Sequence, residues 1–198
     1  MGSGQLQHQT TRRIRSDQLT DMRARLGISV AQCLRAFCLC VGSVTFMAGS
    51  SLGQVIGDAA EMERLQVKAE EAIGNDDPEG AAMTMGRAAL MARRLGLLSK
   101  DDAASARLYR GAESLFRSQE HGYRAMALFR RAGGQLPASS GVCGSLALAQ
   151  GSMEHALSDL GHDSPPPASL AERARRWRDS TDNWAIVVSS MIADYQCR

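Results

Sequence analysis

Apolar residues along most of this chain recur every three or four positions, the spacing that places them on one face of an α-helix. Two such runs, 59–73 and 79–96, are separated by Gly74 and a polar turn. Pro78 suits the first position of the second helix, where an N–H would have no intrahelical partner. The pattern therefore predicts two helices joined by a short turn. Their predicted inward-facing residues are Met62, Leu65, Ala69, Ala72 and Ile73, then Ala81, Ala82, Met85, Ala88, Ala89, Ala92 and Leu95.

The same periodicity continues beyond residue 100. Ser99 or the pair Asp101 and Asp102 can cap a third helix, because such side chains accept hydrogen bonds from the free N–H groups of a helix start. Glycine disfavours a helix interior, so we expect Gly122 to end this helix and a fourth helix to continue to Gly133. The predicted inward-facing residues are Leu108, Tyr109, Ala112, Leu115 and Phe116, then Ala125, Leu128, Phe129 and Ala132.

The C-terminal part is also predicted to be helical. It begins with three prolines, 165–167, which no helix can cross. An arginine-rich helix over 170–178 and a final helix over 181–195 follow, the latter with Trp184, Val188 and Met191 at core spacing. Because runs of β-branched residues, which favour strands, are almost absent, the expected fold class is all-α.

One segment resembles a known helical repeat. Residues 106–139 match the tetratricopeptide repeat, a helix–turn–helix unit of about 34 residues. Residues 62–95 and 137–164 resemble it more distantly. The matching positions of the first segment are Tyr109, Ala112, Phe116, Ala125, Phe129, Ala132 and Pro137, whereas Glu113 departs from the small residue of the family.

The resemblance implies short antiparallel hairpins stacked as a solenoid, with the C-terminal helix covering the last exposed face. It also implies a groove that binds a peptide or a partner helix. Helix phase then selects the candidate contact residues Arg107, Arg110, Glu113, Arg117 and Arg124.

An uncharged run at 36–53 follows several arginines and ends in small residues, the pattern of a secretory signal. We expect a disordered leader at 1–21, a signal peptide at 22–53 and a helical domain at 54–198, with Met1 or Met22 as the true start. The expected location is the periplasm or the exterior of a bacterial cell. Two alternatives remain for the run: a membrane anchor over 36–57, tethering the protein to the inner membrane, and a buried core helix.

The predicted cleavage after residue 53 would also separate the cysteines into two groups and remove most of the excess positive charge. Cleavage would remove three cysteines and leave only Cys143 and Cys197, a pair that can form a disulfide in an oxidising compartment. Residues 1–50 also hold six arginines against two aspartates, out of 23 basic and 21 acidic residues in all. The remaining domain is therefore slightly acidic, which disfavours a nucleic-acid partner.

No pattern of catalytic or metal-ligating residues stands out. His155 and His162 lack the spacing of a zinc site, and no nucleophile motif of an acyl enzyme is present. We therefore expect neither a cofactor nor a metal, and a non-catalytic module that binds a protein or peptide of the cell envelope. The alternatives are an envelope hydrolase with an unrecognised site and a membrane-anchored structural protein.

Overall fold

The computed structural model describes residues 50–161 and 165–197, with side chains from Asp58 onward. This part contains α2 (Ser50–Gly74), α3 (Pro78–Leu98), α4 (Ala103–Arg131), α5 (Ser140–Leu160), a short 3-10 helix η1 (Ala168–Leu170) and α6 (Ala171–Asp194). No strand occurs among these residues, so the all-α class is confirmed.

The predicted leader 1–21 and most of the predicted signal peptide 22–53 lie outside the described residues. So does most of the alternative anchor over 36–57. Of the helices that the structure describes, none is long and apolar enough to cross a membrane.

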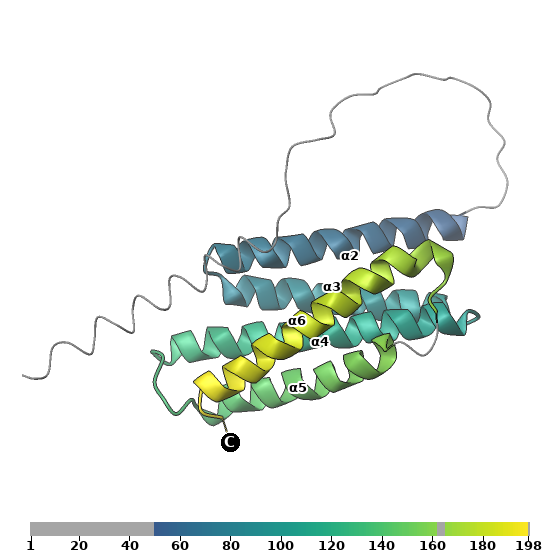
Figure 1. The fold of residues 1–198 in the computed structure, drawn as a ribbon. Coiled ribbons are helices and arrows are strands. Elements are labelled where there is room, and N and C mark those ends of the chain that lie inside the picture. The colour runs from purple at the N-terminus through teal and green to yellow at the C-terminus, as the bar shows by residue number, and fades with distance from the viewer. Residues whose placement is uncertain (1–49, 162–164, 198) are drawn as a thin grey trace, which may run out of the picture. The chain divides into compact units, whose positions relative to one another are not determined.

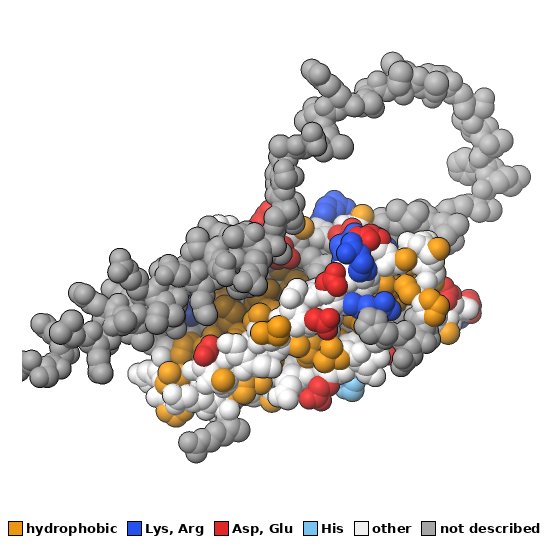
Figure 2. Space-filling model, viewed as in Figure 1, with side chains coloured by type: hydrophobic (Ala, Val, Ile, Leu, Met, Phe, Trp, Pro, Cys, Tyr) orange, Lys and Arg blue, Asp and Glu red, His pale blue; other side chains and the backbone are white. Residues whose placement is uncertain are grey.

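Helices α2, α3, α4 and α5 lie side by side as antiparallel neighbours, each packed against the next along the chain. Helix α6 crosses this layer diagonally, from beside the N-terminal end of α2 to the start of α5 (Figure 1). Ion pairs fix its first half to α2, where Arg173 and Arg176 both bind Glu63 at 2.9 and 2.8 Å. Acidic and basic side chains alternate on this side of the molecule (Figure 2). The arginines of 170–178 thus serve contacts within the fold.

Local sequence signals set the helix starts, and the predicted roles of Pro78 and Asp102 are confirmed. Asp77 caps α3 by accepting a hydrogen bond from Gly80 N, and Pro78 is the first residue of that helix. Asp102 caps α4 by accepting from Ala104 N and Ser105 N. These caps satisfy N–H groups that have no partner within the helix.

The apolar faces meet in one core. Trp177 and Trp184 of α6 insert against the layer: Trp177 contacts the rings of Tyr109 and Phe116, and Trp184 contacts that of Tyr123. The inward-facing residues predicted for 79–96 and for the third helix are all buried. Residues Ala72, Ile73, Leu128 and Phe129 are only partly buried, because they lie near helix ends.

The predicted break at Gly122 is wrong. Helix α4 runs without interruption from Ala103 to Arg131. Gly122 lies in its interior because Trp184 occupies the adjacent space: a Cβ there would be 2.6 Å from Trp184 Cζ2. The two helices that the tetratricopeptide resemblance places within 106–139 are therefore mostly one helix. The described residues form antiparallel helix neighbours and do not show a repeat solenoid.

The C-terminal helices predicted over 170–178 and 181–195 are likewise one helix, α6. Thr181 lies within it and donates a hydrogen bond to Trp177 O at 2.7 Å, so its hydroxyl is satisfied inside the helix. Helix α3 also continues past Gly96 to Leu98.

A disulfide fastens the C-terminus. Cys143 in the first turn of α5 is bonded to Cys197 just beyond α6, as predicted, with 5.3 Å between the two Cα atoms. Beside it, Ala138 N donates to Tyr195 O at 3.0 Å, and the rings of Phe129 and Tyr195 stack with centroids 4.1 Å apart. The end of α6 is thereby joined to both α4 and α5.

Candidate protein-binding face

Helix α3 carries an exposed row of large apolar side chains. Met83, Leu90 and Leu97 are 65%, 55% and 67% exposed. They are seven residues apart, nearly two full turns, and therefore lie along one side of the helix. The core side of α3 is formed instead by alanines, Met85 and Leu95. We call Met83, Leu90 and Leu97 the apolar row.

Helix α4 carries a basic row with the same period. Arg110, Arg117 and Arg124 are again seven residues apart. Each directly follows an aromatic residue, Tyr109, Phe116 or Tyr123, that contacts a tryptophan of α6. Because successive helical residues are turned by about 100°, the basic row points away from α6. Three of the five predicted contact residues form this row.

The two rows run side by side. Met83 and Arg124 line the same hollow, of about 300 Å³, between α3 and α4. Further along, Gly86 lies against Glu120, and Gly96 approaches the backbone of Arg110. These contacts fix an antiparallel register in which Leu90 is level with Arg117 and Leu97 is level with Arg110 along the two helices; the guanidinium of Arg110 itself lies 3.9 Å from Asp159 of α5. We call the two rows together the α3/α4 face.

Glu120 holds two arginines of the basic row in place. Its Oε2 accepts from Arg117 Nη1 at 2.8 Å, and its Oε1 accepts from Arg124 Nη2 at 2.7 Å. The carboxylate side chain is only 10% exposed, whereas the Arg117 and Arg124 side chains are 32% and 50% exposed. One buried negative charge thus positions two positive charges at the surface, so the group retains a net positive charge.

A second line of arginines flanks the apolar row on its other side. Arg87 and Arg94 are seven residues apart on α3, and both are exposed. Arg94 lies 3.7 Å from Asp58 of α2, whereas Arg87 forms no ion pair within the part of the chain that the structure describes. Arginines therefore border the apolar row on both sides.

His121 lies next to this network. Burial lowers the pKa of its imidazole, and the neighbouring Glu120 carboxylate opposes this shift only in part. Its Nδ1 is buried and has no hydrogen-bond partner among the described groups. The histidine is therefore kept neutral, and it adds no charge to the face near neutral pH.

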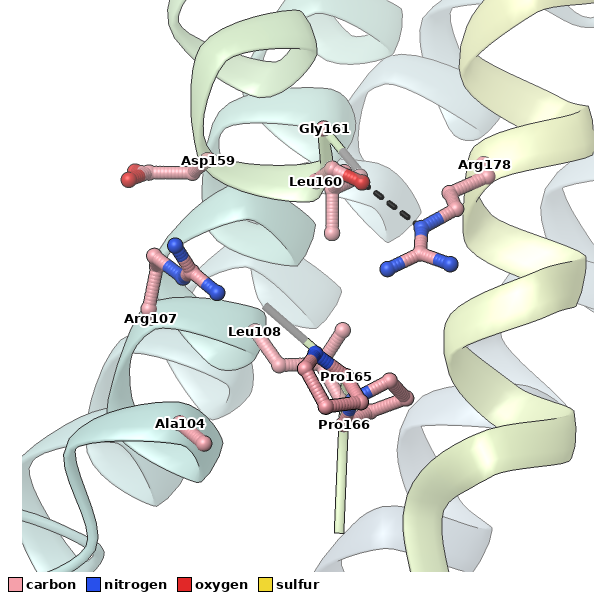
Figure 3. Close-up of a pocket in the computed structure, with 9 residues that line it drawn as sticks. All are labelled: Ala104, Arg107, Leu108, Asp159, Leu160, Gly161, Pro165, Pro166 and Arg178. Atoms are coloured by element: carbon pink, nitrogen blue, oxygen red, sulfur yellow. Dashed lines mark hydrogen bonds between the residues drawn. The ribbon is translucent and has the colours of Figure 1, made fainter. Parts of the chain in front are cut away.

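The remaining predicted contact residues do not extend the basic row. Glu113 is half-buried on α4. Arg107 lies at the far end of the same helix, where it lines a small cavity with Arg178, Asp159 and the chain around Pro165 (Figure 3). That cavity has a volume of about 10 Å³, room for one water molecule, so it does not accommodate a substrate.

A second open hollow of about 440 Å³ lies on α2, around Val67. Glu63 and Glu71 alternate there with Arg64 and Lys68. Because positive and negative side chains balance there, this hollow favours neither an acidic nor a basic partner, whereas the α3/α4 face carries a net positive charge. Across residues 50–161 and 165–197, no three His, Cys, Asp or Glu side chains gather closely enough to hold a metal ion.

The apolar row was missed by sequence reasoning, although its signal is present. Met83, Leu90 and Leu97 fall outside the core periodicity of 79–96 and share a spacing of seven. When one face of a helix is already predicted to be buried in the core, a second apolar stripe on the same helix indicates a surface that another molecule can cover. The buried position of Glu120 had no comparable signal.

Comparison with known proteins provides no evidence about the function of this chain. No protein-family model matches the chain, and no curated protein or solved structure is significantly similar to it.

Proposed function

We propose that this protein is a non-catalytic interaction module whose α3/α4 face binds a peptide or a partner helix. The observation that carries the proposal is the apolar row Met83, Leu90 and Leu97, exposed beside a basic row of equal period. An exposed apolar stripe edged by charges is the usual composition of a helix-binding surface. The tetratricopeptide resemblance supports the same class of function, although the binding surface here is one helix pair and not a stack of repeats.

We further propose that the module acts outside the cytoplasm, in the cell envelope. The uncharged run at 36–53, preceded by arginines, is the support from the sequence. The bond between Cys143 and Cys197 is the support from the fold, because structural disulfides persist mainly in oxidising compartments.

Site-specific photocrosslinking in the native cell tests the binding proposal. A photoreactive residue at Leu90 or Leu97 is expected to trap one discrete protein, identified by mass spectrometry. Ile186 provides the matched control, because it is 70% exposed on α6 and therefore on a different surface. Binding of the trapped protein to the purified module is then measured directly.

Two results would contradict the proposal. One is an identical set of products from Leu90 and Ile186, which would mean that contact follows exposure alone. The other is a trapped protein that binds the purified module with unchanged affinity after Leu90→Glu and Leu97→Glu. Cleavage between residues 50 and 54 in the exported protein, measured by N-terminal sequencing, tests the proposed location separately.

A further inference from the structure

The charge around the apolar row is one-sided, and this restricts what can cover it. Arg87 and Arg94 lie along one side of the row, and Arg110, Arg117 and Arg124 lie along the other. Carboxylates nearby are paired with arginines. Glu120 is shared by two arginines, Asp159 is 3.9 Å from Arg110, and Asp58 is 3.7 Å from Arg94. Glu79, which lines the same hollow as Met83, binds Arg131 at 3.0 Å. A partner therefore meets an apolar strip with positive charge at both edges.

The spacing of the rows also restricts the shape of the partner. Met83 and Leu97 are separated by 14 residues of one helix, or about 21 Å. Apolar residues that repeat every seven positions match the apolar seam of a second helix lying alongside. The hollow between Met83 and Arg124 gives that helix a groove at one end.

Two occupants from this chain itself are disfavoured by charge. A second copy docked through the same face would bring arginine rows against each other, and like charges across an interface are costly. The N-terminal residues 1–50 are also basic, with six arginines against two aspartates. Neither complements the face.

We infer, building on the proposed function, that the partner presents an acidic amphipathic helix to the α3/α4 face. Its apolar seam packs on Met83, Leu90 and Leu97. Carboxylates on both flanks of the seam pair with Arg87 and Arg94 on one side and with the basic row on the other. Charges at such flanking positions select the partner and its orientation in paired helices.

Peptide binding to the purified full-length protein tests this inference. The probe is a fluorescent synthetic helix of about 21 residues, three heptads, with leucines in its seam and glutamates at the flanks. A matched probe has lysine in place of every glutamate. Fluorescence anisotropy is expected to show saturable binding of the glutamate peptide only. The affinity is expected to fall as salt rises, because salt screens exposed charges.

Arg87→Glu is the informative variant. Arg87 is exposed and forms no ion pair with a described residue, so we expect its replacement to leave the fold intact. We expect this variant to bind the glutamate peptide about tenfold more weakly, since a like charge then faces the peptide. Lys68→Glu on α2 is the control, because Lys68 is exposed, lies outside the face and, like Arg87, forms no ion pair with a described residue; this variant is expected to bind as the unmodified protein does. Circular dichroism confirms that both variants are folded.

The outcomes are separable. Equal binding of the two peptides, or no effect of Arg87→Glu, overturns the acidic-helix inference, whereas a partner trapped at Leu90 still supports the proposed function. Vesicles containing phosphatidylglycerol are tested in parallel. The protein could bind these vesicles, lose this binding in Arg87→Glu, and fail to bind the glutamate peptide. That combination of results would assign the face to an anionic membrane and would also overturn the inference.

Discussion

Replacement of Gly122 by alanine tests how α6 packs on α4. Gly122 lies inside α4, where alanine is the better helix former by about 1 kcal/mol. The added Cβ, however, would lie 2.6 Å from Trp184 Cζ2 and 3.2 Å from Met191 Cε. Helix propensity and packing therefore act in opposite directions at this position.

Packing is expected to dominate, because Trp184 cannot move aside freely. Its Nε1 donates to Ser118 Oγ at 3.0 Å, and its ring lies against Tyr123 with centroids 5.0 Å apart. Overpacking of a core costs about 1–3 kcal/mol, so Gly122→Ala should lower the free energy of unfolding by about 1 kcal/mol after the gain in propensity is subtracted. In Gly144→Ala, on α5, the new Cβ meets no atom within 4 Å, and a gain of about 0.5–1 kcal/mol is expected.

Thermal unfolding of the disulfide-bonded protein, followed by circular dichroism, compares the two variants. A difference of about 2 kcal/mol corresponds to about 4–8 °C in Tm for a chain of this size. The expected order is Gly144→Ala above the unmodified protein, and Gly122→Ala below it. If Gly122→Ala is as stable as Gly144→Ala, Trp184 does not pack on Gly122 and the placement of α6 is wrong.

Three further predictions concern stability. Replacing Cys143 and Cys197 by serine should lower the free energy of unfolding by about 4 kcal/mol, from the chain-entropy relation for a separation of 54 residues. Urea unfolding measures this loss, and an unchanged urea midpoint would refute it. Ser118→Ala should lower the free energy of unfolding by about 1–3 kcal/mol, because Trp184 Nε1 then loses its hydrogen-bond acceptor in the core. Ser189→Ala, at the surface, should change the urea midpoint little. Equal effects of the two substitutions would refute this prediction. Because the pKa of His121 is lowered in the folded protein, the unfolded chain binds more protons below pH 6.5, and the free energy of unfolding should fall as the pH drops below that value. In His121→Gln this part of the decline should vanish. An unchanged pH profile would contradict the burial of His121.

The residues that face the core could be predicted because one physical signal determines them. Spacings of three and four place Met85, Ala88 and Leu95 on one side of α3, and burial of that side stabilises the helix. The helix starts at Pro78 and Ala103 could be predicted for a similar reason, since capping by Asp77 and Asp102 involves only neighbouring residues. Local chemistry was sufficient for these features.

The path of α4 through Gly122 could not be predicted in the same way. The cause is a residue 62 positions later in the sequence, Trp184, whose ring needs the space that a side chain would fill. The α3/α4 face depends likewise on the register between two helices, which Gly86 and Glu120 set by close approach. Of the predicted contacts, Arg110, Arg117 and Arg124 share one side of α4 because they share a spacing of seven, which the sequence does show.

The most direct test of the binding claim is methyl NMR of the purified protein with the partner trapped at Leu90. Leucine, isoleucine and methionine methyl groups report the apolar row and the opposite surface in one spectrum. If the α3/α4 face binds the partner, the methyl signals of Met83, Leu90 and Leu97 shift on binding and that of Ile186 does not. Shifts at Ile186 and none in the apolar row would place the partner on α6 and refute the proposed function.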